Sequence, residues 1–160
     1  MAHKIINAFE NIVIAVIALL LIAFIALKAA GFQFFVVMSG SMEPVLPVGS
    51  VVLVEPTPYN EIQVGDDISF VVGEEKVTVT HRVVEKDEGA NTLTTKGVAN
   101  NVSDDPIPAS AVIGKVIFDI PLVGRLLYFL SSLQGKIVAG IVVVAWVIIT
   151  MLIKQLEKSE

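Results

Sequence analysis

The sequence has no cysteine, few histidines and few basic residues. The absence of cysteine is compatible with either an oxidising or a reducing compartment. The 160 residues carry 11 lysines and arginines against 16 aspartates and glutamates, a net charge of −5. This acidic balance and the lack of a basic cluster argue against nucleic acid as a partner. The acidic residues show no spacing typical of a metal-binding loop, so we expect neither a metal nor another cofactor.

Hydrophobic residues make up 54% of the chain, and they concentrate in two uncharged runs near its ends. Residues 12–27 and 137–153 are each slightly shorter than the roughly 20 residues that span a bilayer core. Flanking apolar residues extend the first run, and Lys136 and Lys154 bracket the second. We predict two transmembrane helices. Lys4, Lys154 and Lys158 favour cytoplasmic termini. The alternative for the first run is a cleavable signal peptide, whose apolar core usually has only about 7–15 residues.

Between these runs, short apolar segments alternate with turn residues, which is typical of a mainly β, antiparallel and barrel-like domain. The predicted strands are 34–38, 50–54, 67–72, 76–84, 91–95 and 111–117. The predicted organisation is a tail and anchor over 1–30, an extracytoplasmic domain over 31–130, and a second helix with a short cytoplasmic tail over 131–160. The longest connection, 97–110, has the length of a functional or disordered loop.

Two polar positions in this domain suggest chemistry. Ser41 follows a predicted strand and adjoins a glycine, so it can present its hydroxyl and keep its N–H free, as an acyl-transfer nucleophile must. The same Ser-Gly-Ser composition also fits an ordinary turn. His81 is the only histidine of the domain, and strand alternation places it on an apolar face. It is either a satisfied core residue or a general base. Lys76, on the opposite face, is the weaker candidate base.

Paired aspartates occur at two places. Asp104 and Asp105 lie in the long loop, where an aspartate can supply local backbone hydrogen bonds or a functional carboxylate. Asp66 and Asp67 follow Gly65 at a strand entrance, where a turn role is favoured.

Four motifs in order resemble those of type I signal peptidases. Residues 39–44, Ser-Gly-Ser-Met-Glu-Pro, after an N-terminal anchor resemble the nucleophile box. Residues 64–70 resemble the Gly-Asp strand entrance of that family. Residues 80–84, Thr-His-Arg-Val-Val, are similar to the box that holds the general base in the archaeal and endoplasmic-reticulum branch. Residues 95–104 resemble the last box, and the second apolar helix matches the archaeal type.

The resemblance implies a role for individual residues. Ser41 corresponds to the nucleophile, His81 to the general base and Asp104 to the acid that orients it, with Asp105 as second choice. The Ser39 hydroxyl and the Ser41 backbone N–H correspond to the oxyanion-hole donors. A substrate in strand conformation is expected to add to a sheet edge. The residues expected to bind it are Phe34, Val36, Met38, Thr78, Thr80 and Arg82.

The function implied by the resemblance is that of a membrane-bound serine endopeptidase. It would remove signal peptides from secreted preproteins by acyl-enzyme hydrolysis after small residues. The implied partners are signal peptides of membrane-tethered preproteins, the lipid bilayer and the secretion translocon. The implied location is the cell membrane, or the endoplasmic-reticulum membrane in a eukaryote.

One position departs from the family. The last box reads Gly-Asp in the family and Gly97-Val98 here, and valine can neither accept a hydrogen bond nor carry charge. One alternative is therefore a catalytically impaired homologue that acts as a membrane-anchored binding or accessory subunit. A second is a self-cleaving protease with a lysine base. A transporter component has little support, because the apolar cores of the two spans carry no ionisable residue.

Overall fold

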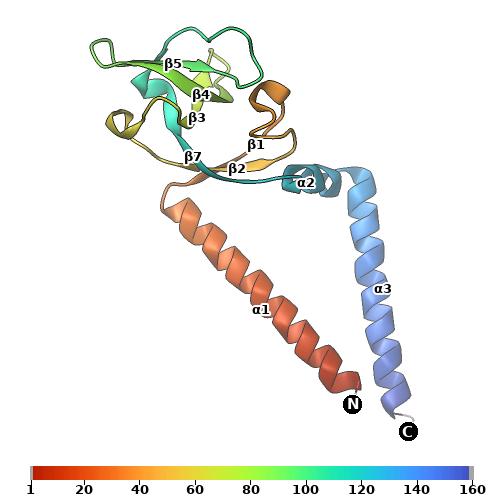
Figure 1. Cartoon of the computed structure of the whole chain (residues 1–160). Coiled ribbons are helices and arrows are strands. Elements are labelled where there is room, and N and C mark those ends of the chain that lie inside the picture. The colour runs from red at the N-terminus through yellow and green to blue at the C-terminus, as the bar shows by residue number, and fades with distance from the viewer. Residues whose placement is uncertain (1, 159–160) are drawn as a thin grey trace. The chain divides into compact units, whose positions relative to one another are not determined.

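The structure is a computed structural model that describes residues 2–158 (Figure 1). The chain divides into two units. One is Lys28–Leu126, and the other comprises the described residues of Met1–Leu27 and Leu127–Glu160. The predicted three-part organisation, which also assigns compartments, stays a prediction.

Two long helices are apolar enough to cross a membrane. They are α1 (Ala2–Ala29) and α3 (Leu133–Lys158), and their candidate spans cover Asn7–Ala29 and Leu133–Ile153, 23 and 21 residues. These lengths meet the roughly 20 residues that a bilayer core requires. The predicted orientation depends on charged side chains near both ends of the chain that lie outside the described side chains: Lys4, Lys154 and Lys158.

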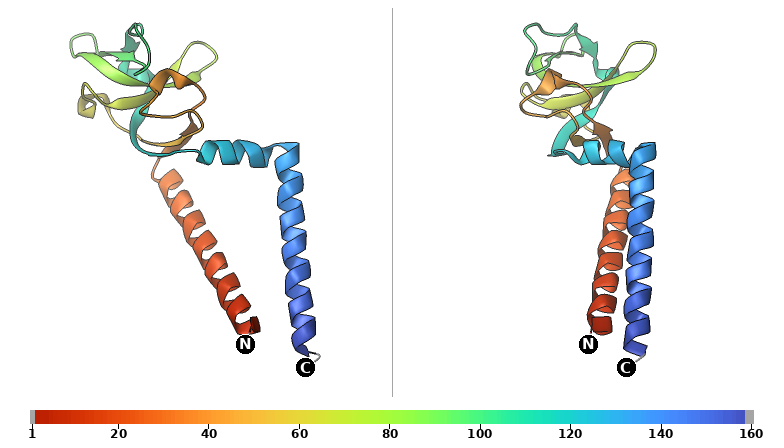
Figure 2. Two further views of the ribbon diagram at one scale, coloured as in Figure 1. Left: turned by 45° about the vertical axis from the view of Figure 1, so that its right-hand side comes forward. Right: turned by 90° about the vertical axis from the view of Figure 1, so that its right-hand side faces the viewer.

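The Lys28–Leu126 unit is built on one antiparallel sheet (Figures 1 and 2). Its strands are β1 (Gln33–Val36), β2 (Val51–Glu55), β3 (Asp67–Val72), β4 (Val77–Asp87), β5 (Thr92–Lys96), β6 (Ile107–Pro108) and β7 (Val112–Ile120). The spatial order is β1-β2-β7-β3-β4-β5-β6, so β1 and β6 form the two edges. The predicted mainly β, antiparallel fold is confirmed, but the sheet does not close into a barrel.

Among the strands and α-helices, two elements have no counterpart in the sequence-based predictions. The two-residue strand β6 lies within the predicted loop, where Pro106 before it and Pro108 within it hide its strand character. Helix α2 (Val123–Ser131) follows β7. The predicted strand at 76–84 begins one residue later, because Lys76 belongs to a turn and has a φ of +52°. Beyond it, an irregularity between Val83 and Glu85 shifts the pairing with β5.

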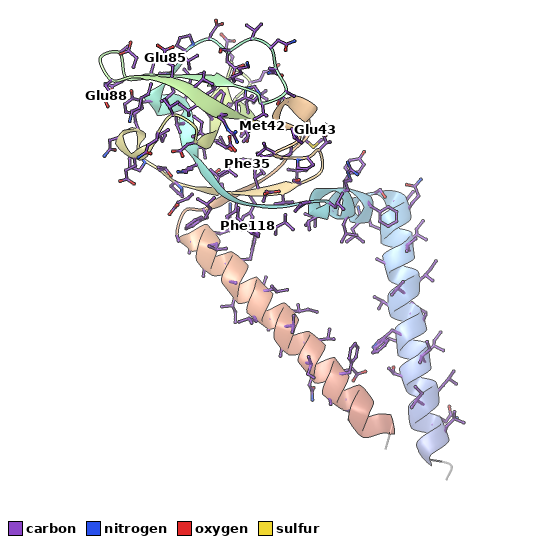
Figure 3. All side chains as sticks on the ribbon, viewed as in Figure 1. Phe35, Met42, Glu43, Glu85, Glu88 and Phe118 are labelled. Atoms are coloured by element: carbon purple, nitrogen blue, oxygen red, sulfur yellow. The ribbon has the colours of Figure 1, made fainter. Side chains whose placement is uncertain are left out.

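Two apolar clusters form the core, one at each end of the sheet order. The first contains Ile62, Ile68, Phe70, Val83, Leu93 and Ile107. The second contains Met42, Leu46, Val52 and Val54, with Phe35 packed against it (Figure 3). Met42 is 1% exposed, so the turn that follows β1 is fastened to the core by its own side chain.

Lys86 on β4 holds a neighbouring turn through its ammonium group. Its Nζ donates to the carbonyl oxygens of Tyr59 at 3.1 Å and Ile62 at 2.9 Å, and more weakly to Asn60 at 3.4 Å. It also lies 4.6 Å from the centre of the Tyr59 ring. The side chain thus ties η2 (Tyr59–Glu61) to the far half of β4.

We expect Lys86→Met to destabilise the β domain by about 1–3 kcal/mol, because three carbonyl groups lose a charged donor while the aliphatic stem remains. Amide hydrogen exchange of the sheet in the full chain measures this loss. Lys76→Met, in the exposed β3–β4 turn, is the control and should leave exchange unchanged. Equal effects of the two substitutions would contradict the proposed role of Lys86 in holding η2 to β4.

Candidate active site

Ser41 is presented by a short helical turn at the end of β1. After β1, the Val37 N–H donates to the Ser50 carbonyl at 2.9 Å and the Gly49 N–H donates to the Val37 carbonyl at 2.9 Å, which continues the strand contact. The chain then enters η1 (Gly40–Met42), whose last residue is buried in the second cluster. The middle residue, Ser41, remains at the surface of the turn.

The backbone of the 97–100 segment holds Ser41 from the other side. The Ala99 N–H donates to the Ser41 carbonyl oxygen at 2.8 Å. A Cβ atom at Gly97 would lie 2.7 Å from that same oxygen, closer than real side chains approach. Only glycine at position 97 therefore permits this contact between the last box and the nucleophile box.

His81 joins Ser41 to Asp104. Its Nε2 lies 3.0 Å from the Ser41 Oγ, and its Nδ1 lies 2.6 Å from the Asp104 Oδ2. A carboxylate can only accept, so Nδ1 carries the proton and Nε2 is left to accept from the serine hydroxyl. The His81 side chain is 10% exposed, and its ring packs edge-on against Phe70, with ring centres 6.3 Å apart. Three residues from separate parts of the chain thus form one hydrogen-bonded row.

The contact with His81 belongs to Asp104 rather than to Asp105, which is exposed. Asp104 has a further partner that the sequence did not point to: the Thr95 hydroxyl donates to the same Oδ2 at 2.6 Å. The Asp104 N–H also donates to the Thr95 carbonyl oxygen at 2.8 Å. The sequence feature that could have indicated this contact is a threonine on the buried face of the predicted strand 91–95.

The oxyanion-hole candidates lie beside the Ser41 hydroxyl. The Ser39 Oγ is 3.2 Å from the Ser41 Oγ. The Ser41 N–H lies in the first turn of η1, where backbone donors have no acceptor within the helix. A hydroxyl and an N–H group are thus close to the position where negative charge would develop.

A cavity of about 490 Å³ adjoins the serine. One wall comes from the end of β1 and the turn after it, and the other comes from the first half of β4. Four of the predicted substrate-binding residues line it: Val36, Met38, Thr78 and Thr80.

The other two predicted substrate-binding residues, Phe34 and Arg82, are not among the lining residues. Arg82 instead donates from Nε and Nη2 to the two carboxylate oxygens of Asp67 on β3, at 2.7 and 2.9 Å. This hydrogen-bonded pair raises the pKa of Arg82 above its ordinary value. We therefore leave Phe34 and Arg82 out of the proposed substrate site.

The remaining acidic and basic candidates lie elsewhere. Asp66 accepts from the Gln63 N–H at 2.9 Å and pairs with Lys115, so it organises the turn before β3. Lys76 lies exposed in the β3–β4 turn, whereas the histidine lies at the serine. Among residues 2–158, no group of three or more His, Asp or Glu side chains is placed to hold a metal ion.

Val98 has an apolar environment. It is half-buried and packs against the second cluster, which also contains Met42. The carboxylate at the His81 ring nitrogen comes from Asp104, six residues further along the chain.

Fold and geometry define a class of protein: a β domain between two membrane-length helices, carrying a serine, a histidine and an aspartate in hydrogen-bond contact. No protein-family model matches the chain. It is 33% identical over 109 residues to the signal peptidase complex catalytic subunit SEC11 of Fusarium vanettenii, covering 61% of this chain and 63% of that protein. The SEC11 subunit of Tuber melanosporum is 32% identical over 118 residues, covering 61% and 62%. Signal peptidase I W of Bacillus subtilis is 41% identical over 83 residues, covering 50% and 43%.

These similarities support assignment of the chain to the type I signal peptidase family, which its four motifs resemble. The matched region spans less than two thirds of the length of each of these relatives.

We expect Gly97→Ala to break the hydrogen bond between Ala99 and Ser41, because the added methyl group has no room beside the Ser41 carbonyl. Amide exchange in the full chain should show faster exchange at Ala99, with protection retained along β3 and β4. Gly89→Ala, in the exposed β4–β5 turn, is the matched control. Unchanged protection at Ala99 in the Gly97 variant would show that the close contact is not required.

Proposed function

We propose that the chain is a membrane-bound serine endopeptidase that removes signal peptides from preproteins through an acyl-enzyme. The observation that supports this most strongly is the contact of one imidazole with both the Ser41 hydroxyl and the Asp104 carboxylate. The names of the SEC11 relatives, which denote a catalytic subunit of a signal peptidase complex, support the same activity.

In the proposed reaction, the Ser41 Oγ attacks the carbonyl carbon of the scissile peptide bond. His81 Nε2 takes the serine proton during the attack and then gives it to the departing amine. Asp104 keeps the Nδ1 proton in place and stabilises the imidazolium that forms. A water molecule then attacks the acyl ester, with His81 again as the base, and the serine is regenerated.

The oxyanion of the tetrahedral intermediate would be stabilised by the Ser39 hydroxyl and the Ser41 N–H. Preorganised donors of this kind act where charge develops and cost no reorganisation during the reaction. The 3.2 Å separation of the two serine oxygens puts the Ser39 hydroxyl within reach of an oxygen bound next to Ser41.

The substrate is proposed to lie extended in the cavity between β1 and β4. β1 is an edge strand and pairs only with β2. β4 pairs with β3 over its first half, whereas its pairing with β5 begins at Arg82. The edge of each strand that faces the cavity is therefore proposed to pair with the extended substrate, with alternate side chains of the peptide in the cavity. Met42 and Leu46 line the cavity and are almost fully buried. We propose that their bulk favours small side chains in the substrate.

The proposed setting is a membrane, with the two helices as anchors, the β domain on the extracytoplasmic side and both termini in the cytoplasm. The proposed partners are preprotein signal peptides, lipid and the secretion translocon. A histidine as base supports the archaeal and endoplasmic-reticulum branch rather than the bacterial one. The membrane would then be the cell membrane, or that of the endoplasmic reticulum in a eukaryote.

Val98 favours a second candidate function, that of an impaired homologue acting as a binding or accessory subunit. We give it second place, because Asp104 supplies a carboxylate to His81 while Val98 packs in an apolar cluster. The family's aspartate at this position is thus not required for the contacts of the Ser-His-Asp row.

The full chain in detergent should cleave a preprotein at its signal peptide, and Ser41→Ala should abolish cleavage, because no other hydroxyl contacts the His81 ring in the described contacts. Ser110→Ala, at an exposed serine of η3 (Ala109–Ala111), is the matched control and should cleave normally. Cleavage that persists in Ser41→Ala, or a wild-type chain that cleaves nothing, would overturn the proposal.

We expect Ser39→Ala to lower kcat by about 10²–10³-fold, the usual effect of removing one oxyanion donor. Ser39→Thr keeps a hydroxyl and should retain most of the activity. Single-turnover cleavage of a preprotein measures both. A rate for Ser39→Ala close to that of the wild type would exclude Ser39 from the oxyanion hole.

A further inference from the structure

Thr95 is a fully buried polar residue at the end of the hydrogen-bonded row. It lies on β5, is 0% exposed, and its hydroxyl donates to the Asp104 Oδ2 at 2.6 Å. We propose that Thr95 is a positioning residue that fixes the Asp104 carboxylate in the orientation His81 requires. Its effect on catalysis rests on the proposed function, whereas its effect on the histidine does not.

The hydroxyl at position 95 needs an explanation, because a buried strand position ordinarily favours an apolar β-branched side chain. A buried hydroxyl without a hydrogen-bond partner destabilises the fold, and valine has nearly the same shape. Leu93, two residues earlier on the same face of β5, is also fully buried and is apolar. The partner that accounts for a polar atom at position 95 is the Asp104 carboxylate.

The two residues are joined twice. The Asp104 N–H donates to the Thr95 carbonyl oxygen at 2.8 Å, and the Thr95 hydroxyl donates to the Asp104 side chain. These two bonds close a ring between the backbone and the side chain of Asp104. The ring limits the rotation of the carboxylate about both of its side-chain torsions.

Asp104 depends on this support because it does not belong to a helix or a strand. It lies between β5 and β6, in a segment without regular structure, and its side chain is 30% exposed. β5, by contrast, is paired on both sides, with β4 and with β6. Thr95 thus connects a carboxylate on a loop to a strand within the sheet.

Both donors meet the same oxygen atom. His81 Nδ1 and Thr95 Oγ1 each lie 2.6 Å from the Asp104 Oδ2. Without the hydroxyl, the carboxylate can rotate away from the imidazole toward water. The imidazole then loses the contact that keeps its proton on Nδ1. No proton leaves Thr95 at any step, and its hydroxyl only orients the Asp104 carboxylate.

Kinetics of the full chain test the catalytic consequence. Thr95→Val should lower kcat by about 10–100-fold, as expected for misplacement of a catalytic group, with KM within about twofold because no substrate contact changes. Thr95→Ser restores the hydroxyl and should recover most of kcat. Thr94→Val, on the opposite face of β5, is the matched control. A Thr95→Val enzyme with wild-type kcat would overturn a positioning role.

NMR of the histidine ring nitrogens tests the proposal without relying on catalysis. With Ser41→Ala as background and His3→Gln to remove the other histidine, labelled His81 should be protonated at Nδ1. Adding Thr95→Val should introduce the Nε2-protonated form while the amide spectrum of the sheet stays folded. An unchanged tautomer would refute the proposal. If the tautomer changes but the chain that retains Ser41 cleaves no preprotein, only the proposed function is refuted.

Discussion

The site depends on one imidazole that makes two hydrogen bonds at once. His81 is held on β4 by its pairing with β3, where it lies opposite Ile68, and it reaches Ser41 on one side and Asp104 on the other. Neither of those partners lies on a strand of the sheet. β4 therefore holds His81 in a fixed position, and the segments that carry Ser41 and Asp104 must bring these two residues to it. Most of the remaining features of the β domain can be understood as means of doing so.

The segment after β5 brings both loop residues to His81. Near its start, Gly97 and Ala99 hold the Ser41 carbonyl, and near its end Asp104 returns to bond with Thr95. The Met42 side chain fastens the other side of the turn that carries Ser41 to the core. A segment that has no regular structure is thus ordered by contacts at both ends. This order explains why the family aspartate at position 98 can be replaced by a valine that packs in the core while the hydrogen-bonded row is retained.

The six longer strands, the two apolar helices and the family were predictable, because period-2 alternation, long apolar runs and short motifs are all local signals. The choice of Asp104 over Asp105 came from motif spacing, and the geometry of the contact agrees with it. Thr95 was not predictable, because its role depends on a loop that folds back nine residues later. The open sheet was not predictable either, since whether the edge strands β1 and β6 pair is a long-range property. The pairing of Arg82 with Asp67 was not predictable for a similar reason: the partner lies on the adjacent strand, 15 residues away.

The most direct measurement of the proposed chemistry is the covalent state of Ser41 with a peptide boronic acid that carries small residues one and three positions before the boron. Boron NMR of the full chain in detergent, followed by peptide mapping, should find a tetrahedral adduct on the Ser41 hydroxyl. The adduct should be absent in Ser41→Ala and weakened in His81→Ala. An adduct on another residue, or none on a chain that still cleaves a preprotein, would contradict a nucleophilic role for Ser41.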